Sequence, residues 1–127
     1  MPTQIHSVIV WTEDLPRLTA FYRDVMGLQL EMETDGFVAF QGAGGAQLAL
    51  GAHSEVSGRA KDPYRLMVDF QVDDCQAEYD RLKGQGVEFM RSPGQDEGAI
   101  IATFADPDGN LLQLFQMTSP PRREANP

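Results

Sequence analysis

The sequence predicts an α+β protein made of two βαβββ modules whose curved mixed sheets form a shared cup. The order of one strand, one helix and three strands can be read twice along the chain. Between the two readings, residues 52–63 mix Gly, Ser, Pro and charged residues without periodicity, as a connector does. A small curved sheet leaves one face open, and a duplicated module can cover it. We therefore expect a single domain over 1–118, with modules at 4–51 and 64–118 and a disordered tail at 119–127.

The first module begins with a strand at residues 5–11, which are rich in β-branched side chains. Asp14 then has the character of an N-cap, and Pro16 falls in the first helical turn, where its missing N–H costs nothing. Apolar residues recur at helical spacing until Gly27 ends the helix. Three short strands are expected next, at residues 28–33, 36–41 and 46–50.

The second module repeats this order. A strand at 64–72 precedes a helix capped by Asp73 or Asp74. The buried face of that helix is marked by Cys75, Tyr79 and Leu82. Three more strands are expected at residues 87–91, 100–104 and 111–117. The last two are separated by Asp106-Pro107-Asp108-Gly109-Asn110, which is turn chemistry because proline presets φ and glycine tolerates a positive φ.

Composition narrows the functional classes. No apolar run approaches the roughly 20 residues that span a bilayer, and the N-terminus shows no export signal, so we expect a cytoplasmic protein. The single cysteine, Cys75, excludes an internal disulfide and a thiolate zinc cluster. A net charge of −9 disfavours nucleic acid and anionic membrane as partners, since both need clustered Lys and Arg.

Several short motifs carry a family resemblance. Asp14-Leu15, Phe21-Tyr22 and Gly27-Leu28, followed late in the chain by residues 106–110, are similar to the glyoxalase, bleomycin-resistance and extradiol dioxygenase superfamily, also called vicinal oxygen chelate proteins. The resemblance covers residues 5 to 117. It implies paired βαβββ modules and commonly a dimer, so we expect a homodimer.

The resemblance also identifies four positions where metal-using relatives place His, Glu or Gln. Here these positions are Ser7, Ala49, Met67 and Gln113. Alanine cannot bind a metal, and a thioether is a poor ligand for a hard or borderline divalent ion. We therefore predict no metal and no cofactor. An alternative is a rebuilt site of His6, Asp69 and Gln113, which would need a register slip to turn His6 inward. His53, in the connector, is expected to be solvated.

Strand alternation from these positions predicts which residues line the cup. The lining combines apolar and aromatic side chains with a few polar groups, as small-molecule pockets do. The predicted ligand-binding residues are Ser7, Ile9, Trp11, Gln47, Ala49, Met67, Asp69, Gln71, Gln113 and Phe115. Asp69 could hold a cationic or hydroxylated ligand, and Trp11 could stack on a flat ring or receive a cation.

Three functions follow from this reading. The first is a metal-free protein that binds a small organic molecule, cationic or aromatic in character, similar to the bleomycin-resistance branch that sequesters a drug. The second is a superfamily enzyme, a glyoxalase-like lyase, isomerase or dioxygenase, with an atypical metal site or with Asp69 as a metal-free base. The third is a regulatory or immunity module without a small ligand.

Overall fold

The computed structural model describes residues 4–42 and 45–118, which form two compact units. The division falls between Ala60 and Lys61, inside the connector expected at 52–63. We call the described residues before this division module one and those after it module two. The tail expected at 119–127 lies outside the described residues.

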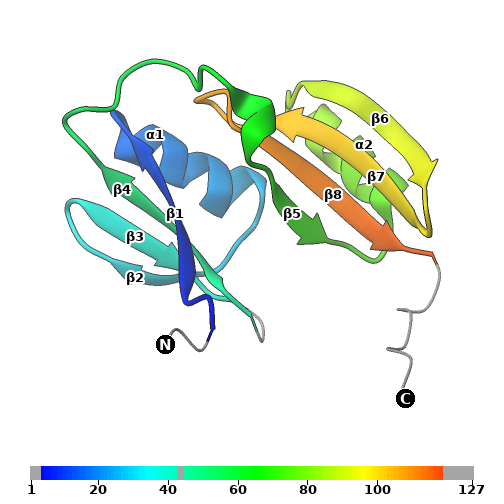
Figure 1. The fold of residues 1–127 in the computed structure, drawn as a ribbon, viewed down its shortest axis with the longest axis horizontal. Coiled ribbons are helices and arrows are strands. Elements are labelled where there is room, and N and C mark those ends of the chain that lie inside the picture. Colours follow the sequence, from blue (N-terminus) through cyan, green and yellow to red (C-terminus); the bar gives the residue numbers. More distant parts are fainter. Residues whose placement is uncertain (1–3, 43–44, 119–127) are drawn as a thin grey trace. The chain divides into compact units, whose positions relative to one another are not determined.

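Module one has the element order predicted from the sequence (Figure 1). Its four strands form one sheet in the order β1-β4-β3-β2, in which β1 and β4 are parallel and the other neighbours are antiparallel. The elements are β1 (Ser7–Thr12), α1 (Leu15–Ala20), a π-helical turn η1 (Phe21–Val25), β2 (Leu30–Glu33), β3 (Phe37–Phe40) and β4 (Gln47–Ala52).

Module two repeats this topology. Its sheet has the order β5-β8-β7-β6, again with one parallel pair, β5 and β8. The elements are a 3-10 turn η2 (Pro63–Arg65), β5 (Val68–Gln71), α2 (Cys75–Gly84), β6 (Phe89–Asp96), β7 (Ala99–Ala105) and β8 (Leu111–Met117). The predicted fold class, α+β with two βαβββ modules and mixed sheets, is confirmed.

Each module has its core between its helix and one face of its sheet. In module one the fully buried Tyr22 ring lies 6.2 Å from the ring of Phe40, centroid to centroid. In module two Phe89 joins the ring of Tyr79 on α2 to that of buried Phe104. The other large side chains that are fully buried include Leu18, Val38, Leu50, Leu82, Leu112 and Leu114. Burying each such side chain stabilises the fold by about 1.5–3 kcal/mol, which is what holds a single helix on each sheet.

The predicted helix starts are confirmed in both modules. The Asp14 carboxylate accepts a hydrogen bond from the Arg17 N–H at 3.2 Å, and the Asp74 carboxylate accepts one from the Ala77 N–H at 3.0 Å. Asp74 rather than Asp73 is therefore the cap of α2. Within residues 4–42 and 45–118, neither helix has the length and apolar character needed to cross a membrane.

Three predicted element boundaries were wrong. The helix of module one does not continue as regular α-helix to Gly27, because the Met26 N–H bonds to the Phe21 carbonyl five residues earlier and widens the last turn. The strand expected at 64–72 begins only at Val68, because Pro63 opens a 3-10 turn and strand pairing starts at Val68–Leu112.

The third error concerns β6, which continues past Pro93 to Asp96 instead of ending at residue 91. The strand lies at the edge of its sheet, where proline removes no ladder hydrogen bond that a neighbour needs. Two shifts in its register with β7, on either side of Arg91, absorb the irregularity.

The turn before β8 is built around the buried carboxylate of Asp106, which is 3% exposed. Its Oδ1 accepts the backbone N–H groups of Asp108 and Asn110, and its Oδ2 accepts the Asn110 side-chain amide, at 2.9–3.0 Å. Gly109 has a φ of 80°, which favours glycine. This turn sets where β8 starts, and hence the register of the strand that carries Gln113 and Phe115.

We predict that Asp106→Ala lowers the free energy of unfolding by about 2–4 kcal/mol, because it leaves buried N–H donors without an acceptor. Urea unfolding followed by circular dichroism measures the loss. The matched control is Asp96→Ala, whose side chain is exposed. Equal losses in the two variants would contradict the role given to the Asp106 carboxylate.

Candidate functional site

The face of the module one sheet that points away from α1 carries the predicted ligand residues of that module. Leu48 and Leu50 are buried and pair with Val8 and Val10 on the helix side. Alternation therefore places the intervening residues on the opposite side, which we call open face one. Its paired positions are Ser7 with Gln47, Ile9 with Ala49, and Trp11 with Gly51.

Open face one contains an aromatic cluster, formed by Trp11, Phe37 and His53. The Trp11 ring centroid lies 6.3 Å from that of Phe37 and 5.4 Å from that of His53, which meets it edge-on. Gly51 lies beneath the indole, since a Cβ added there would approach Trp11 Cζ3 to 2.4 Å and Phe37 Cδ1 to 3.2 Å. The missing side chain at Gly51 thus lets the indole lie on the backbone of β4, while 42% of Trp11 stays exposed.

Polar groups occupy the other end of open face one. The side-chain amide of Gln47, on β4, donates a hydrogen bond to the carboxylate of Glu31, on β2. Gln47 therefore brings a carboxylate with it, and a ligand would meet the pair rather than a lone amide. Ala49 is almost fully buried between these polar groups and the aromatic cluster.

Module two presents an equivalent face, open face two, on the side of its sheet that faces away from the buried Leu112 and Leu114. Asp69 pairs with Gln113 and Gln71 pairs with Phe115, so all four predicted residues of β5 and β8 are neighbours. The strand register extends the first pair into a polar row across the sheet. This row consists of Asp69, Gln113, Thr103 and Arg91.

Asp69 is the carboxylate of this row. No hydrogen bond or ion pair to its carboxylate is found among the described residues, although the side chain retains access to solvent. Desolvation by neighbouring atoms raises the pKa of Asp69 above its ordinary value of 3.8. An unpaired carboxylate of this kind attracts a cation or a hydrogen-bond donor, because such a partner stabilises its charged form.

The four positions singled out by the family resemblance have the same relation in both modules. In module one Ser7 pairs with Gln47, which lies two residues before Ala49. In module two Asp69, which lies two residues after Met67, pairs with Gln113. This matched offset supports the assignment of the positions. Ser7, Ala49 and Met67 supply no imidazole or carboxylate donor, and the single amide oxygen of Gln113 does not hold a divalent metal by itself.

The described residues contain no group of three or more His, Cys, Asp or Glu side chains that could hold an ion. The alternative set of His6, Asp69 and Gln113 includes an amide and draws on both modules, and it stays a prediction. His6 lies just before β1 and is exposed, while its carbonyl accepts the Gln47 N–H. The β1–β4 register runs without a shift from Ser7 to Thr12, so the strand contains no slip that would turn His6 onto open face one.

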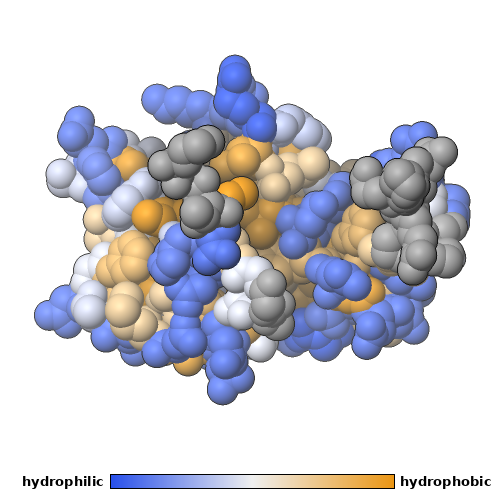
Figure 2. Space-filling view, turned by 60° about the horizontal axis from the view of Figure 1, so that its bottom comes forward, coloured by the Kyte–Doolittle hydropathy of each residue, from blue (hydrophilic) through white to orange (hydrophobic). Residues whose placement is uncertain are grey.

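Apolar residues of these faces reach the surface. Figure 2 shows hydrophobic side chains gathered in surface patches that hydrophilic ones border. The large apolar side chains exposed in the two modules include Ile9, Trp11, Met32, Met67 and Met117. Exposed apolar side chains that form a contiguous patch are typical of surfaces that bind a ligand or another protein.

Three cavities within the modules lie elsewhere. One, of about 390 Å³, lies between α1 and the strands β2 and β3; two others, of about 470 and 450 Å³, flank the start of α2. Of the predicted ligand-binding residues, only Gln71 lines one of these three. The open faces are therefore candidate sites because of their side chains and register.

Sequence reasoning missed four residues that contribute to the open faces. His53 was expected to be solvated; it is exposed but contacts Trp11, and its Nδ1 accepts the Glu55 N–H at 3.1 Å. Phe37, Thr103 and Arg91 lie on strands whose faces were not assigned. Alternation along residues 36–41 could have found Phe37, whereas Arg91 depends on the register shifts of an edge strand.

We predict that Gly51→Ala displaces the indole of Trp11, the only tryptophan of the chain. The added methyl group overlaps the ring, so the emission maximum should move to longer wavelength, with a loss of about 1–3 kcal/mol of stability. Intrinsic fluorescence and urea unfolding measure both effects. Gly36→Ala is the control, because nothing lies within 4 Å of its added Cβ. An unchanged spectrum in Gly51→Ala would refute the close approach.

We predict that Asp69→Asn stabilises the protein more near pH 7 than near pH 3. The raised pKa means that the folded state holds this proton more tightly than the unfolded state, so wild-type stability falls as pH rises from 3.8 through the folded value. The substitution removes that loss, whereas at low pH both side chains are neutral. Thermal unfolding of the variant and wild type at both pH values tests this, with exposed Asp96→Asn as control. A difference that is independent of pH would contradict it.

Comparison with known proteins agrees with this architecture. The family model described as "Glyoxalase/Bleomycin resistance protein/Dioxygenase superfamily" matches residues 4–114. A Vibrio parahaemolyticus protein named "Probable lactoylglutathione lyase" is 34% identical over 116 residues, covering 81% of this chain and 83% of that protein. Bacillus subtilis YetH, described as uncharacterized, is 25% identical over 118 residues and covers 90% of this chain and 98% of its own length.

Solved structures show the same fold. The crystal structure of a glyoxalase/bleomycin resistance protein/dioxygenase from Nocardioides has a TM-score of 0.73 and 24% identity, covering 98% of this chain and 91% of that chain. Lactoylglutathione lyase from Agrobacterium tumefaciens has a TM-score of 0.71 and 23% identity, covering 91% of this chain and 94% of that one. The chain therefore belongs to the glyoxalase/bleomycin resistance protein/dioxygenase superfamily.

Proposed function

We propose that this protein is a metal-free member of the superfamily that binds a small organic molecule, of cationic and aromatic character, and sequesters it. The observation that carries this proposal is the donor set at the family's metal positions, Ser7, Ala49, Met67 and Gln113. These side chains cannot hold the metal ion that supplies Lewis-acid activation in the metal-dependent members of the superfamily.

The chemistry of the two open faces favours a cationic aromatic guest. On open face one, the exposed part of the Trp11 indole offers a surface for ring stacking or for a cation, worth about 0.5–2 kcal/mol. The Gln47–Glu31 pair adds a carboxylate. On open face two, the Asp69 carboxylate has no partner among the described residues, so an organic cation could pair with it and offset the cost of its desolvation without displacing another ion pair.

The net charge of −9 works in the same direction, because it raises the local concentration of cations and repels anions. The proposed setting is the cytoplasm, and the proposed assembly is a homodimer. Light scattering of the purified protein tests the assembly independently of any ligand.

We predict that protein purified without chelator contains less than stoichiometric Ni, Zn, Fe or Mn, and that divalent ions leave its melting temperature unchanged. In the same preparation, bleomycin and a panel of cationic aromatic drugs should quench Trp11 fluorescence. Trp11→Ala and Asp69→Asn should each weaken the binding of any hit roughly tenfold, which corresponds to about 1.4 kcal/mol. Calorimetry measures the binding to Trp11→Ala, because that variant has no tryptophan to quench. Asp96→Asn is the control for lost charge.

Two results would overturn the proposal. Stoichiometric metal held by the wild-type protein would return the chain to the metal-dependent part of the superfamily. Unchanged affinity in both Trp11→Ala and Asp69→Asn would remove the two open faces from the binding site.

A second candidate function is a superfamily enzyme in which Asp69 acts as a general base without a metal. The raised pKa of Asp69 favours it, since a carboxylate with such a pKa takes up a proton closer to neutral pH. The similarity to the protein named "Probable lactoylglutathione lyase" also supports an activity. Turnover that Asp69→Asn abolishes while ligand binding survives would favour this enzyme over the sequestering protein.

A further inference from the structure

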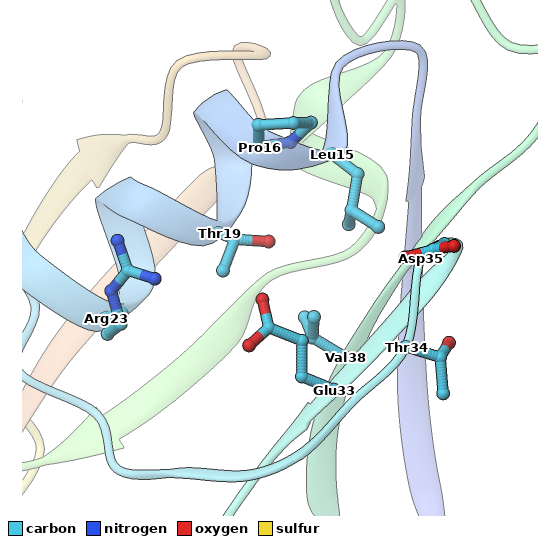
Figure 3. Close-up of a pocket in the computed structure, with 8 residues that line it drawn as sticks. All are labelled: Leu15, Pro16, Thr19, Arg23, Glu33, Thr34, Asp35 and Val38. Atoms are coloured by element: carbon cyan, nitrogen blue, oxygen red, sulfur yellow. The ribbon is translucent and has the colours of Figure 1, made fainter.

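The cavity of about 390 Å³ in module one is a separate feature of the fold, on the helix side of the sheet (Figure 3). Its walls come from α1 and η1 on one side and from the β2–β3 hairpin on the other. Leu15 and Val38 supply its apolar surface, and both are buried. Since β1 and β4 take no part in its lining, this cavity is distinct from open face one.

An unpartnered hydroxyl points into the cavity. Thr19 is only 4% exposed, and its Oγ1 has no hydrogen-bond partner among the residues that the structure describes. In Figure 3 this oxygen faces the space between the helix and the hairpin, as does the carboxylate of Glu33. A buried hydroxyl without a partner is costly and rare, so it marks a place where a hydrogen-bonding group is missing.

The charges around Thr19 determine what that group would be. Arg23 lies at one end of the cavity, but its guanidinium already donates two hydrogen bonds to the Asp24 carboxylate, at 2.8 and 3.0 Å. Glu33 and Asp35 also line the cavity, and no ion pair to either is found in the described part of the chain. Asp24, together with the charge of Glu33, raises the pKa of the Arg23 guanidinium. Three carboxylates, those of Asp24, Glu33 and Asp35, thus lie around the cavity with one guanidinium, and the net charge there is negative.

The wall that carries Arg23 is the π-helical turn. The bond from the Met26 N–H to the Phe21 carbonyl defines this turn, and single π-turns of this kind occur frequently at functional sites. It forms the end of the helix that faces Glu33. The cavity thus combines a widened helical turn, an unpartnered hydroxyl and an excess of carboxylates over cations.

We propose that this cavity is a second ligand site, which takes a small primary amine whose ammonium group lies between the Thr19 hydroxyl and the Glu33 carboxylate. An ammonium group has three donors and suits one neutral and one or two anionic oxygen acceptors. Leu15 and Val38 would contact the aliphatic part of the amine. The site does not depend on the ligand proposed for the open faces.

The test uses 1,4-diaminobutane as the probe, with 1-butanol and butyrate as the neutral and anionic comparisons, in two-dimensional amide NMR of the full chain. We expect the diamine to shift the amides of residues 15–23 and 33–38, and the other two compounds to leave them in place. Thr19→Val and Glu33→Gln should each weaken binding at least about tenfold, whereas Thr19→Ser, which keeps the hydroxyl, should stay within about threefold of wild type.

The control for lost charge is Glu88→Gln, an exposed residue of module two that lines none of the three cavities. Removing the unpartnered hydroxyl in Thr19→Val should also raise the melting temperature without ligand; should that variant fail to fold, Glu33→Gln decides. The proposal is overturned if the diamine shifts no cavity amide, if butyrate binds as well as the diamine, or if Glu33→Gln binds like wild type.

Discussion

A four-stranded sheet that one short helix covers has a second face that this helix does not contact, and this constraint operates twice in the chain. In each module the helix contacts one set of alternating side chains, and the other set lies on the opposite face of the sheet. The parallel pair at the start of each sheet then decides which residues meet there. Trp11, Ile9 and Ser7 in one module correspond to Gln71, Asp69 and Met67 in the other.

The two open faces have the same register but different chemistry. Open face one is shaped by close packing, since the absence of a side chain at Gly51 lets Trp11 lie on the sheet and meet Phe37 and His53. Open face two is shaped by polarity, with the carboxylate of Asp69 at the end of a row of polar side chains. A duplicated fold has thus acquired one face with an aromatic cluster and one face with a row of polar side chains.

On the helix side of module one, the core leaves a cavity at its edge. Tyr22 and Phe40 close the centre of the module, whereas the edge between α1 and the hairpin stays hollow and contains the hydroxyl of Thr19. An apolar side chain at this place would fill space at no electrostatic cost. The polar and acidic lining instead gives the two sides of one sheet separate binding chemistry.

Local signals in the sequence determined much of the fold. The caps Asp14 and Asp74, the turn at Asp106 and the alternation along β1, β5 and β8 each depend on residues close in the chain, and so the element order and the facing of Trp11 and Asp69 could be predicted. Tertiary structure alone decided the π-turn, the continuation of β6 past Pro93, the contact of His53 with Trp11 and the hollow beside Thr19. These features depend on which segments pack together and in which register. No local sequence pattern predicts such contacts, because the residues that make them are far apart in the chain.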